Sequence, residues 1–367
     1  MVSPRPRPGI LEITPYVGGK AKSASSKPLA KLSSNESPLG PSPKAMAAYR
    51  ELAGQLHRYP EGHSTELRQA LGRRFNLDPE LIVCGAGSDE LISLLMRAYA
   101  GPGDEVLYSR HGFLMYPLAA LSAGAQPVAA PERDLTADVD ALLARVTSRT
   151  RLVFLANPNN PTGSYLPAGE LERLQAGLPP DVVLVIDAAY AEYADAPDYA
   201  SGLELARGTP NTVMLRTFSK LHGLAALRLG WMTAHPAIID VMNRVRGPFN
   251  VSLPAQAVGV AALEDLEHQE AARAHNARWL PWLRDELRRL GLTVHPSLGN
   301  FILVDFPPEP GRDAAAANAW LENEGIVPRQ MDAYGLPNSL RISVGLEEEN
   351  RRVVEALEAF VRGWERP

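Results

Sequence analysis

Val182-Val183-Leu184-Val185-Ile186-Asp187 is an unbroken apolar run that ends on a carboxylate. A run of this kind, rich in β-branched residues, is typical of a strand buried on both faces of a parallel sheet. Between about residues 43 and 235, similar runs alternate with helical segments. The runs are Leu81–Cys84, Glu105–Tyr108, Leu152–Ala156, Val182–Ile186, Val213–Leu215 and Leu229–Thr233. This alternation predicts an α/β fold, in which helices cover both faces of a mostly parallel sheet.

The pattern changes beyond residue 250. A helical region rich in Ala, Glu and Arg, at about 254–290, leads to three strand-like runs and then to an amphipathic helix at Glu347–Trp364. The three runs are Phe301–Phe306, Ile326–Val327 and Leu340–Val344. This order predicts a second, smaller α+β domain. We therefore expect an N-terminal arm that forms part of the small domain (1–42), a large domain that binds the ligand (43–250) and a small C-terminal domain (251–367).

Composition excludes several classes of function. The 367 residues include 37 Lys and Arg and 42 Asp and Glu. Because the basic residues are scattered along the chain, we expect no nucleic-acid partner. A single cysteine, Cys84, offers neither an internal disulfide nor a zinc cluster, and we expect no metal. Because no apolar run is long enough to span a bilayer and Met1–Gly9 lacks the apolar core of a secretory signal, we expect a soluble, cytoplasmic protein without a membrane partner.

Unusual polar residues follow the C-terminal ends of the predicted strands, where ligands bind in open α/β sheets. Gly85-Ala86-Gly87-Ser88-Asp89-Glu90 follows the first run and opens an apolar helix. A glycine loop at a helix N-terminus can hold a phosphate through its N–H groups and the helix dipole. The same segment is equally well explained as a capped turn between a strand and a helix.

Three more segments extend the pattern. Asn157-Pro158-Asn159-Asn160-Pro161-Thr162-Gly163 presents an asparagine amide, Asp187 and Tyr190 follow the buried run, and Thr217-Phe218-Ser219-Lys220 is followed by Arg228. Each has an ordinary explanation as a turn, a helix cap or a solvated lysine. Together they have one chemical meaning, because a phosphate loop, a carboxylate for a pyridinium nitrogen and an amine for an aldehyde suit one cofactor.

The sequence resembles the fold-type I pyridoxal-phosphate enzymes, and among them the histidinol-phosphate aminotransferases. The resemblance runs from Ile13-Thr14-Pro15-Tyr16 to the last helix. Its other matching segments are Ser34-Asn35-Glu36-Ser37-Pro38, Arg58-Tyr59-Pro60, Gly87-Ser88-Asp89-Glu90, Pro158-Asn159-Asn160-Pro161-Thr162-Gly163, Asp187-Ala188-Ala189-Tyr190, Thr217-Phe218-Ser219-Lys220 and Leu340-Arg341-Ile342-Ser343-Val344-Gly345. It implies a large domain that binds pyridoxal 5'-phosphate, with a smaller domain beside it.

The resemblance also implies roles for single residues. Lys220 would hold the cofactor as a Schiff base and then move a proton between the substrate Cα and the cofactor C4', which requires a lowered lysine pKa. Burial and the cations Arg228 and Arg341 would lower this pKa. Asp187 would keep the ring nitrogen protonated, and Asn160 and Tyr190 would donate to the ring hydroxyl.

The remaining implied contacts concern the phosphate, the ring face and the substrate. The phosphate would be held by Gly87, Ser88, Asp89, Thr217, Ser219, Arg228 and, from a second subunit, Tyr59. This last contact implies a homodimer with shared active sites. Phe113 matches the aromatic residue that stacks on the ring, although on sequence alone it is as well explained by the core. Arg341 fits a substrate carboxylate, and Arg329 with Arg341 would meet a substrate phosphate, with Tyr16 and Asn35 lining the site.

The implied reaction is transamination between L-histidinol phosphate and 2-oxoglutarate, giving imidazole acetol phosphate and L-glutamate, within histidine biosynthesis. Two other activities use the same motifs: an aromatic or broad-range amino acid aminotransferase and a threonine-phosphate decarboxylase. A ligand-sensing module without activity would need a damaged lysine or aspartate, and both are present. We expect His111 to form structural hydrogen bonds, with substrate contact the alternative, and Cys84 to be a buried apolar residue.

Overall fold

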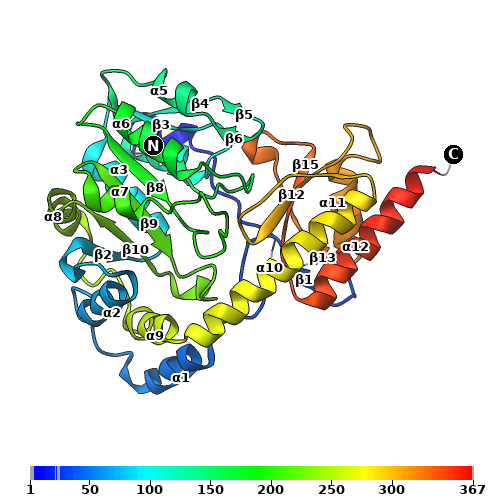
Figure 1. The fold of residues 1–367 in the computed structure, drawn as a ribbon, viewed down its shortest axis with the longest axis horizontal. Coiled ribbons are helices and arrows are strands. Elements are labelled where there is room, and N and C mark those ends of the chain that lie inside the picture. The colour runs from blue at the N-terminus through cyan, green and yellow to red at the C-terminus, as the bar shows by residue number, and fades with distance from the viewer. Residues whose placement is uncertain (1–3, 21, 23–24, 366–367) are drawn as a thin grey trace.

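The computed structural model describes residues 4–20, 22 and 25–365. Figure 1 shows a large part, built around a twisted sheet, beside a smaller part that holds β12, β15, α11 and α12. The fold class predicted from the sequence is confirmed, because the sheet is mostly parallel, helices flank it, and a smaller α+β unit follows. Residues 1–3, 21, 23 and 24 of the predicted N-terminal arm lie outside the described residues.

The central sheet has seven strands in the order β2-β10-β9-β8-β7-β3-β4. Strands β4, β3, β7, β8 and β9 pair in parallel, whereas β10 is antiparallel to both β9 and β2. The strands are β2 (Ile82–Gly85), β3 (Glu105–Ser109), β4 (Gln126–Ala130), β7 (Thr150–Ala156), β8 (Val183–Asp187), β9 (Thr212–Thr217) and β10 (Gly230–Ala234). Each of the six predicted runs overlaps one of these strands, with three of the runs starting one residue early, and Asp187 closes β8 at the middle of the sheet.

One strand of the sheet, β4, was not predicted. It forms an edge, pairs only with β3, and contains Pro127, which has no N–H group to donate to a neighbour. A proline argues against a strand in a sequence reading, but it is tolerated at an edge, where only one side of the strand is paired. The tertiary position of this segment therefore explains why its sequence gave no strand signal.

Alternate residues of β8 face opposite layers of helices. Val183 and Val185 pack with α3, α4 and α8, whereas Leu184 and Ile186 pack with the helices of the other face, including α6. The helices of the large part are α1 (Pro43–Glu51), α2 (Thr65–Phe75), α3 (Ser88–Tyr99), α4 (Met115–Ala123), α5 (Val139–Leu143), α6 (Ala168–Gly177), α7 (Leu203–Gly208) and α8 (Pro236–Val245). Burial on both faces explains why this strand is apolar throughout.

The smaller part is built on an antiparallel sheet in the order β11-β12-β15-β14. Its elements are β11 (Thr293–Val294), β12 (Phe301–Asp305), α11 (Ala314–Asn323), β13 (Ile326–Val327), β14 (Arg329–Gln330), β15 (Ser339–Ser343) and α12 (Glu347–Arg362). Strand β1 (Ala30–Lys31) pairs in parallel with β13, so the N-terminal segment contributes to this part. Two short strands elsewhere, β5 (Glu132–Arg133) and β6 (Thr136–Ala137), form a hairpin.

The predicted helical region at 254–290 is two helices, α9 (Leu253–Glu264) and α10 (Leu266–Arg289). Asp265 leaves the helical conformation between them, and its carboxylate accepts a hydrogen bond from the N–H of His268 in the first turn of α10. Helix α9 packs with α1 and α2 on the core of the large part, whereas α10 reaches the core of the smaller part (Figure 1). We therefore propose that the boundary between two domains lies at Asp265, not at residue 250.

Single-turn 3-10 helices complete the fold at Ile10–Glu12, Ala53–Gln55, Pro79–Leu81, Ala225–Leu227, Asp332–Tyr334 and Gly363–Glu365. Several α-helices begin on a Ser or Asp side chain that accepts an N–H of the first turn, which satisfies one of the donors that the helix leaves unpaired. These capping residues include Ser42, Asp138, Ser252, Asp265 and Asp313. Within the described residues, no helix has the length and apolar character that a membrane crossing requires.

The core of the smaller part gives a stability prediction. Leu357 of α12 is 0% exposed and packs among Leu321, Ile342 and Val353. Leu357→Ala should lower the free energy of unfolding by about 2–5 kcal/mol, because it removes buried methyl groups and leaves a cavity. Urea unfolding followed by fluorescence measures this loss. Glu355→Ala, an exposed site on the same helix, should change stability by no more than about 0.5 kcal/mol; equal effects of the two substitutions would contradict the assignment of this core.

Candidate active site

A cavity of about 220 Å³ lies at the C-terminal ends of the central strands, where Ala156 closes β7, Asp187 closes β8 and Thr217 closes β9. This is the edge at which polar residues were predicted to gather. The residues that line the cavity are Ser34, Glu36, Ser88, Asp89, Phe113, Ala156, Pro158, Asn160, Asp187, Ala189, Tyr190, Thr217, Ser219, Lys220, Ala225 and Arg228. Five separate loops of the large part and one N-terminal segment therefore meet at one site.

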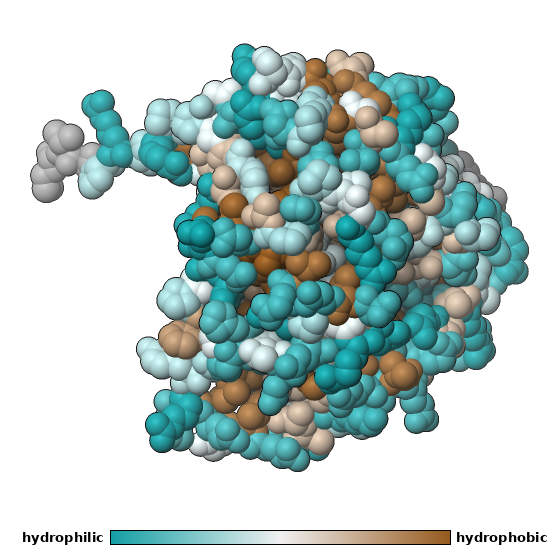
Figure 2. All heavy atoms as spheres, turned by 60° about the vertical axis from the view of Figure 1, so that its left-hand side comes forward, coloured by the Kyte–Doolittle hydropathy of each residue, from teal (hydrophilic) through white to brown (hydrophobic). Residues whose placement is uncertain are grey.

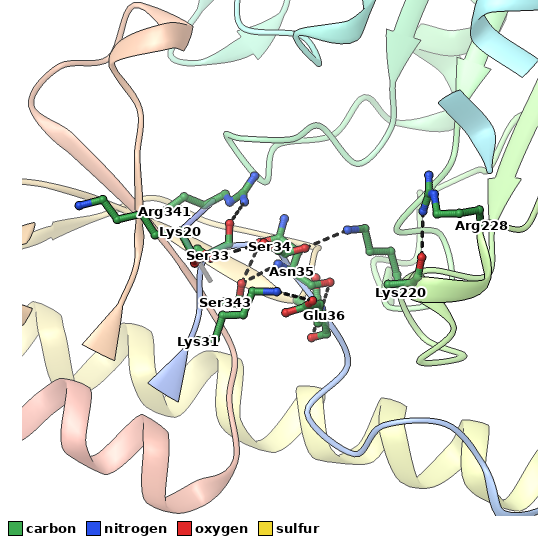
Figure 3. A network of polar contacts seen from close by, with 12 residues as sticks. Lys20, Lys31, Ser33, Ser34, Asn35, Glu36, Lys220, Arg228, Arg341 and Ser343 are labelled. Carbon is green, nitrogen blue, oxygen red and sulfur yellow. Dashed lines mark hydrogen bonds and ion pairs between the residues drawn. The ribbon is translucent and has the colours of Figure 1, made fainter. Parts of the chain in front are cut away.

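Lys220 projects across the cavity from the loop after β9. Its Nζ donates to the backbone oxygen of Ser34 over 3.2 Å and lies 5.6 Å from the centroid of the Tyr190 ring (Figure 3). Burial lowers the pKa of Lys220 to about 8, helped by the positive charges of Arg341 and Arg228. The amine is therefore neutral in a much larger fraction of molecules than an ordinary lysine near neutral pH.

Asp187 lies on the floor of the cavity and is almost fully buried. Its Oδ2 accepts a hydrogen bond of 2.9 Å from the hydroxyl of Tyr116, whereas its Oδ1 is buried without a hydrogen-bond partner among the described residues. Burial raises the pKa of this carboxyl to about 6, and the bond from Tyr116 opposes the rise. A buried carboxylate oxygen without a partner is costly, so this atom calls for a cation or a donor in the cavity.

Asn160 is held by a residue of the smaller part. Arg341 of β15 is only 6% exposed, and its Nη1 donates to Oδ1 of Asn160 while its Nη2 donates to the Ser33 carbonyl over 2.7 Å. Since Oδ1 is used as an acceptor, it is the Nδ2 amide group of Asn160 that remains to donate to a ligand. Arg341 is thus buried and is not a surface ion pair, and it contacts a cavity residue without lining the cavity itself.

Tyr190 and Asn35 are joined directly. The Nδ2 of Asn35 donates to the Tyr190 hydroxyl over 2.8 Å, and Ser343 of β15 fixes Asn35 by exchanging two hydrogen bonds with it. Asn35 has a φ of 53°, in the left-handed region, and its two neighbours Ser34 and Glu36 both line the cavity (Figure 3). Asn35 itself does not line it, so the structure places this residue behind Tyr190 and not at the cavity wall.

The glycine loop before α3 packs closely under Arg228. A Cβ atom at Gly87 would lie 2.6 Å from Nη2 of Arg228, and Gly87 has a φ of 84°, so the position requires glycine. Arg228 donates from Nη2 to Asp89 over 2.9 Å and from Nη1 to the Ser219 hydroxyl over 3.4 Å. Ser88 starts α3, whose first N–H groups have no acceptor within the helix. A guanidinium, hydroxyls and helix N–H groups thus converge at one end of the cavity.

Phe113 and Tyr59, two aromatic residues expected to contact the cofactor, differ in their position relative to the cavity. Phe113 lines the cavity and meets Tyr116 edge-on, with ring centroids 5.9 Å apart, so it has one side on the core and one on the site. Tyr59 is 82% exposed and stacks on Phe249 at 4.7 Å. It does not line the cavity of its own chain.

The structure places Tyr16 and Arg329 in a second cavity, of about 510 Å³, between the N-terminal segment, α4 and β14. The guanidinium carbon of Arg329 lies 5.7 Å from the Tyr16 ring centroid, and Nη2 donates to the Val17 carbonyl over 2.5 Å. Arg329 is also paired with Arg341 across strands β14 and β15. The two predicted substrate arginines are therefore neighbours, but Arg329 lines the second cavity, whereas Arg341 contacts Asn160 of the first cavity without lining it.

His111 and Cys84 have structural surroundings. His111 Nδ1 contacts Glu132 Oε2 at 2.7 Å, its backbone N–H donates to the same carboxylate, and its carbonyl accepts from Asn159. It does not line the cavity, so its contacts are those of a structural hydrogen-bonder. Cys84 is buried in β2, where burial raises its thiol pKa to about 12, which makes a thiolate unfavourable.

Three residues at this site carried no assigned role in the sequence analysis. Ser34 and Glu36 line the cavity, although the segment that contains them was recognised by resemblance. Tyr116 reaches Asp187 across 71 positions of sequence. Tyr116 lies three residues after Phe113, which was assigned to the cofactor ring. No local sequence pattern indicates that the hydroxyl of Tyr116 reaches a carboxylate so distant in the sequence.

Comparisons with known proteins agree along nearly the whole chain. Residues 27–357 match the family "Aminotransferase class I and II". A histidinol-phosphate aminotransferase from Paramagnetospirillum magneticum is 57% identical over 98% of this chain and 99% of that protein, and one from Rhodospirillum centenum is 59% identical over 99% and 100%. A crystal structure of histidinol-phosphate aminotransferase from Sinorhizobium meliloti in complex with pyridoxal 5'-phosphate has a TM-score of 0.90 and 30% identity, covering 99% of each chain.

These matches share the fold described above and extend from the N-terminal segment to α12. The chain therefore belongs to the class I and II aminotransferase family and, within it, groups with the histidinol-phosphate aminotransferases.

Proposed function

We propose that this enzyme binds pyridoxal 5'-phosphate and transfers an amino group between L-histidinol phosphate and 2-oxoglutarate, giving imidazole acetol phosphate and L-glutamate in histidine biosynthesis. One observation carries the chemistry: the amine of Lys220 lines the same cavity as the carboxylate of Asp187, whose Oδ1 has no hydrogen-bond partner among the described residues. The choice of substrate rests on full-length relatives at 57% and 59% identity that carry the corresponding name.

The residues of the cavity fit the cofactor. Among the described residues, the buried Oδ1 of Asp187 has no hydrogen-bond partner, as expected of an atom that pairs with a protonated ring nitrogen. At the other end, Arg228, Ser219 and the first turn of α3 form a cationic, donor-rich site for a phosphate. When bound, pyridoxal phosphate supplies an aldehyde that takes up amino groups and a ring that accepts electrons.

Each group of residues has a defined task in this proposal. Asp187 would hold a negative charge against the ring nitrogen, and Asn160 Nδ2 and Tyr190 would donate to the ring oxygen. The backbone N–H groups of Ser88 and Asp89 would hold the phosphate, together with Thr217, Ser219 and Arg228, beside Gly87. Phe113 would cover one face of the ring. Lys220, whose lowered pKa increases the fraction of neutral amine, would anchor the cofactor and then take the proton from the substrate Cα.

The substrate would be held by the two neighbouring arginines. Arg341, buried beside Asn160, suits a carboxylate or phosphate close to the cavity, and Arg329 with Tyr16 would meet the distal phosphate from the second cavity. Asn35 was expected to line the substrate site. Its contact with the Tyr190 hydroxyl supports a different role, in which it orients Tyr190 from behind.

A second subunit would complete the site. Tyr59 is exposed and stacks on Phe249, itself 44% exposed, which suits a surface that packs against another copy. Figure 2, in which the left-hand side of Figure 1 comes forward, shows apolar side chains in brown among hydrophilic ones in teal. We therefore propose a homodimer in which Tyr59 reaches the partner's phosphate. The free, buried Cys84 is compatible with a reducing compartment, which supports a cytoplasmic location.

A substrate panel tests the proposed reaction. With 2-oxoglutarate as acceptor, kcat/KM for histidinol phosphate should exceed that for phenylalanine and for threonine phosphate by at least about tenfold, if two arginines meet the substrate phosphate and the pocket suits imidazole. Steady-state assays that measure glutamate formation make this comparison. A preference for phenylalanine would indicate an aromatic aminotransferase, and release of carbon dioxide from threonine phosphate would overturn transamination.

The lowered pKa of Lys220 predicts a pH dependence. Because the neutral amine is the reactive form, the rate at which apoprotein takes up pyridoxal phosphate should rise with pH and level off above about pH 8. Absorbance follows the uptake, and borohydride followed by peptide mass spectrometry should locate the adduct on Lys220. Lys220→Ala should remove the adduct, whereas Lys44→Ala, an exposed lysine on α1, should not. A rate that still climbs steeply at pH 10 would contradict the lowered pKa.

Arg329 provides a test of the phosphate assignment. Arg329→Ala should lower kcat/KM for histidinol phosphate roughly 10- to 100-fold, the range expected for a lost charged hydrogen bond, and should affect glutamate much less. Arg312→Ala, which removes an exposed arginine paired with Glu309 outside both cavities, serves as the matched control. Equal losses for both substrates would refute a specific contact between Arg329 and the phosphate.

A further inference from the structure

Tyr116 is a fully buried tyrosine, and among the described residues its hydroxyl forms one hydrogen bond. Its side chain is 0% exposed, and its ring stacks on Phe154 at 4.8 Å and meets Phe113 edge-on. The hydroxyl reaches Oδ2 of Asp187 over 2.9 Å. Helix α4 thus provides a neutral donor to a carboxylate that belongs to the central strand β8.

The two oxygens of Asp187 consequently have different surroundings. Oδ2 is occupied by the Tyr116 hydroxyl, whereas Oδ1 is buried and has no hydrogen-bond partner among the described residues. A carboxylate that is held at one oxygen cannot rotate without breaking that bond. The arrangement leaves one oxygen, in one orientation, for a ligand in the cavity.

The electrostatic surroundings of Asp187 give this bond a second effect. Burial raises the pKa of Asp187, and the charge of Asp89 on α3 raises it further. The Tyr116 hydroxyl, the backbone N–H of Ala189, which makes no hydrogen bond to Oδ1, and the charge of Lys220 act in the opposite direction. Burial and the neighbouring carboxylate keep the Tyr116 pKa well above its usual value, so the tyrosine stays protonated and donates. A hydrogen bond to the ionised form of an acid favours ionisation.

We propose that Tyr116 is a positioning residue that holds Oδ2 of Asp187, so that Oδ1 is presented, ionised, to the protonated ring nitrogen of pyridoxal phosphate. The inference rests on the proposed function, since it assumes that this cofactor occupies the cavity. Tyr116 does not line the cavity and acts only through Asp187.

The ring of Tyr116 also fills space in the core, so a test must separate the hydroxyl from the ring. Tyr116→Phe keeps the packing on Phe154 and Phe113 and removes only the donor to Asp187. Tyr99→Phe is the matched control, because Tyr99 packs against the same core, and it does not line the cavity. Equal thermal midpoints of the two variants and the wild type establish that both fold.

The first measurement is the affinity of apoprotein for pyridoxal phosphate as a function of pH. Below the pKa of Asp187, binding must displace a proton, so affinity falls about tenfold per pH unit. Loss of the Tyr116 bond raises this pKa further, so the fall should begin at higher pH. Relative to wild type, Tyr116→Phe should bind roughly five- to tenfold more weakly at pH 6 than at pH 8.5, whereas Tyr99→Phe should follow the wild-type curve.

The second measurement is the nitrogen NMR shift of bound, ring-labelled pyridoxal phosphate. A more basic Asp187 withdraws the proton, so the ring nitrogen of Tyr116→Phe should shift toward the unprotonated value at pH 8.5, with wild type and Tyr99→Phe unchanged. If the binding curve and the NMR shift of Tyr116→Phe coincide with those of the wild type, the inference about Tyr116 is overturned. The proposed function is not, because the wild type still binds the cofactor. A wild-type protein that binds no pyridoxal phosphate overturns the proposed function together with it.

Discussion

A carboxylate buried at the end of the central strand is the constraint on which the site depends. Asp187 has little contact with water, one oxygen is held by Tyr116, and the other has no hydrogen-bond partner in the part of the chain that the structure describes. Burying a charge in this way is unfavourable, and the raised pKa of about 6 expresses that cost. The sheet order places β7 and β9 on either side of β8, so the loops that carry Asn160 and Lys220 necessarily flank this carboxylate. Groups with strongly shifted pKa values, such as this buried carboxyl, tend to lie at functional sites.

The site also requires that the large and the smaller part of the chain contact each other beside this carboxylate. Ser343 of β15 fixes Asn35, which in turn contacts Tyr190 of the large part, and Arg341 of the same strand holds Asn160. These contacts are short polar bonds between residues that are almost all buried, and such bonds are sensitive to small displacements. The geometry of the donors around the cavity therefore depends on how the small domain sits against the sheet.

Much of the fold could be predicted from local pattern, and the exceptions have physical causes. The strand that ends at Asp187 was predicted because burial on both faces leaves an unbroken apolar run. The edge strand β4 was not, since Pro127 is tolerated only because one side of the strand is unpaired. The single helical region beyond residue 253 is divided by Asp265, a side chain that caps the second helix.

The sequence by itself determined the order of elements, the edge of the sheet at which polar residues gather, and the identities of Lys220 and Asp187, because strand periodicity and position are local properties of the chain. Only the tertiary structure decided which groups these residues meet. The hydroxyl of Tyr116 reaches Asp187, Asn35 lies behind Tyr190 and not at the cavity wall, and Tyr16 lines a separate cavity. Such contacts join segments that are distant in sequence, and they follow from packing and backbone direction, which no local pattern encodes.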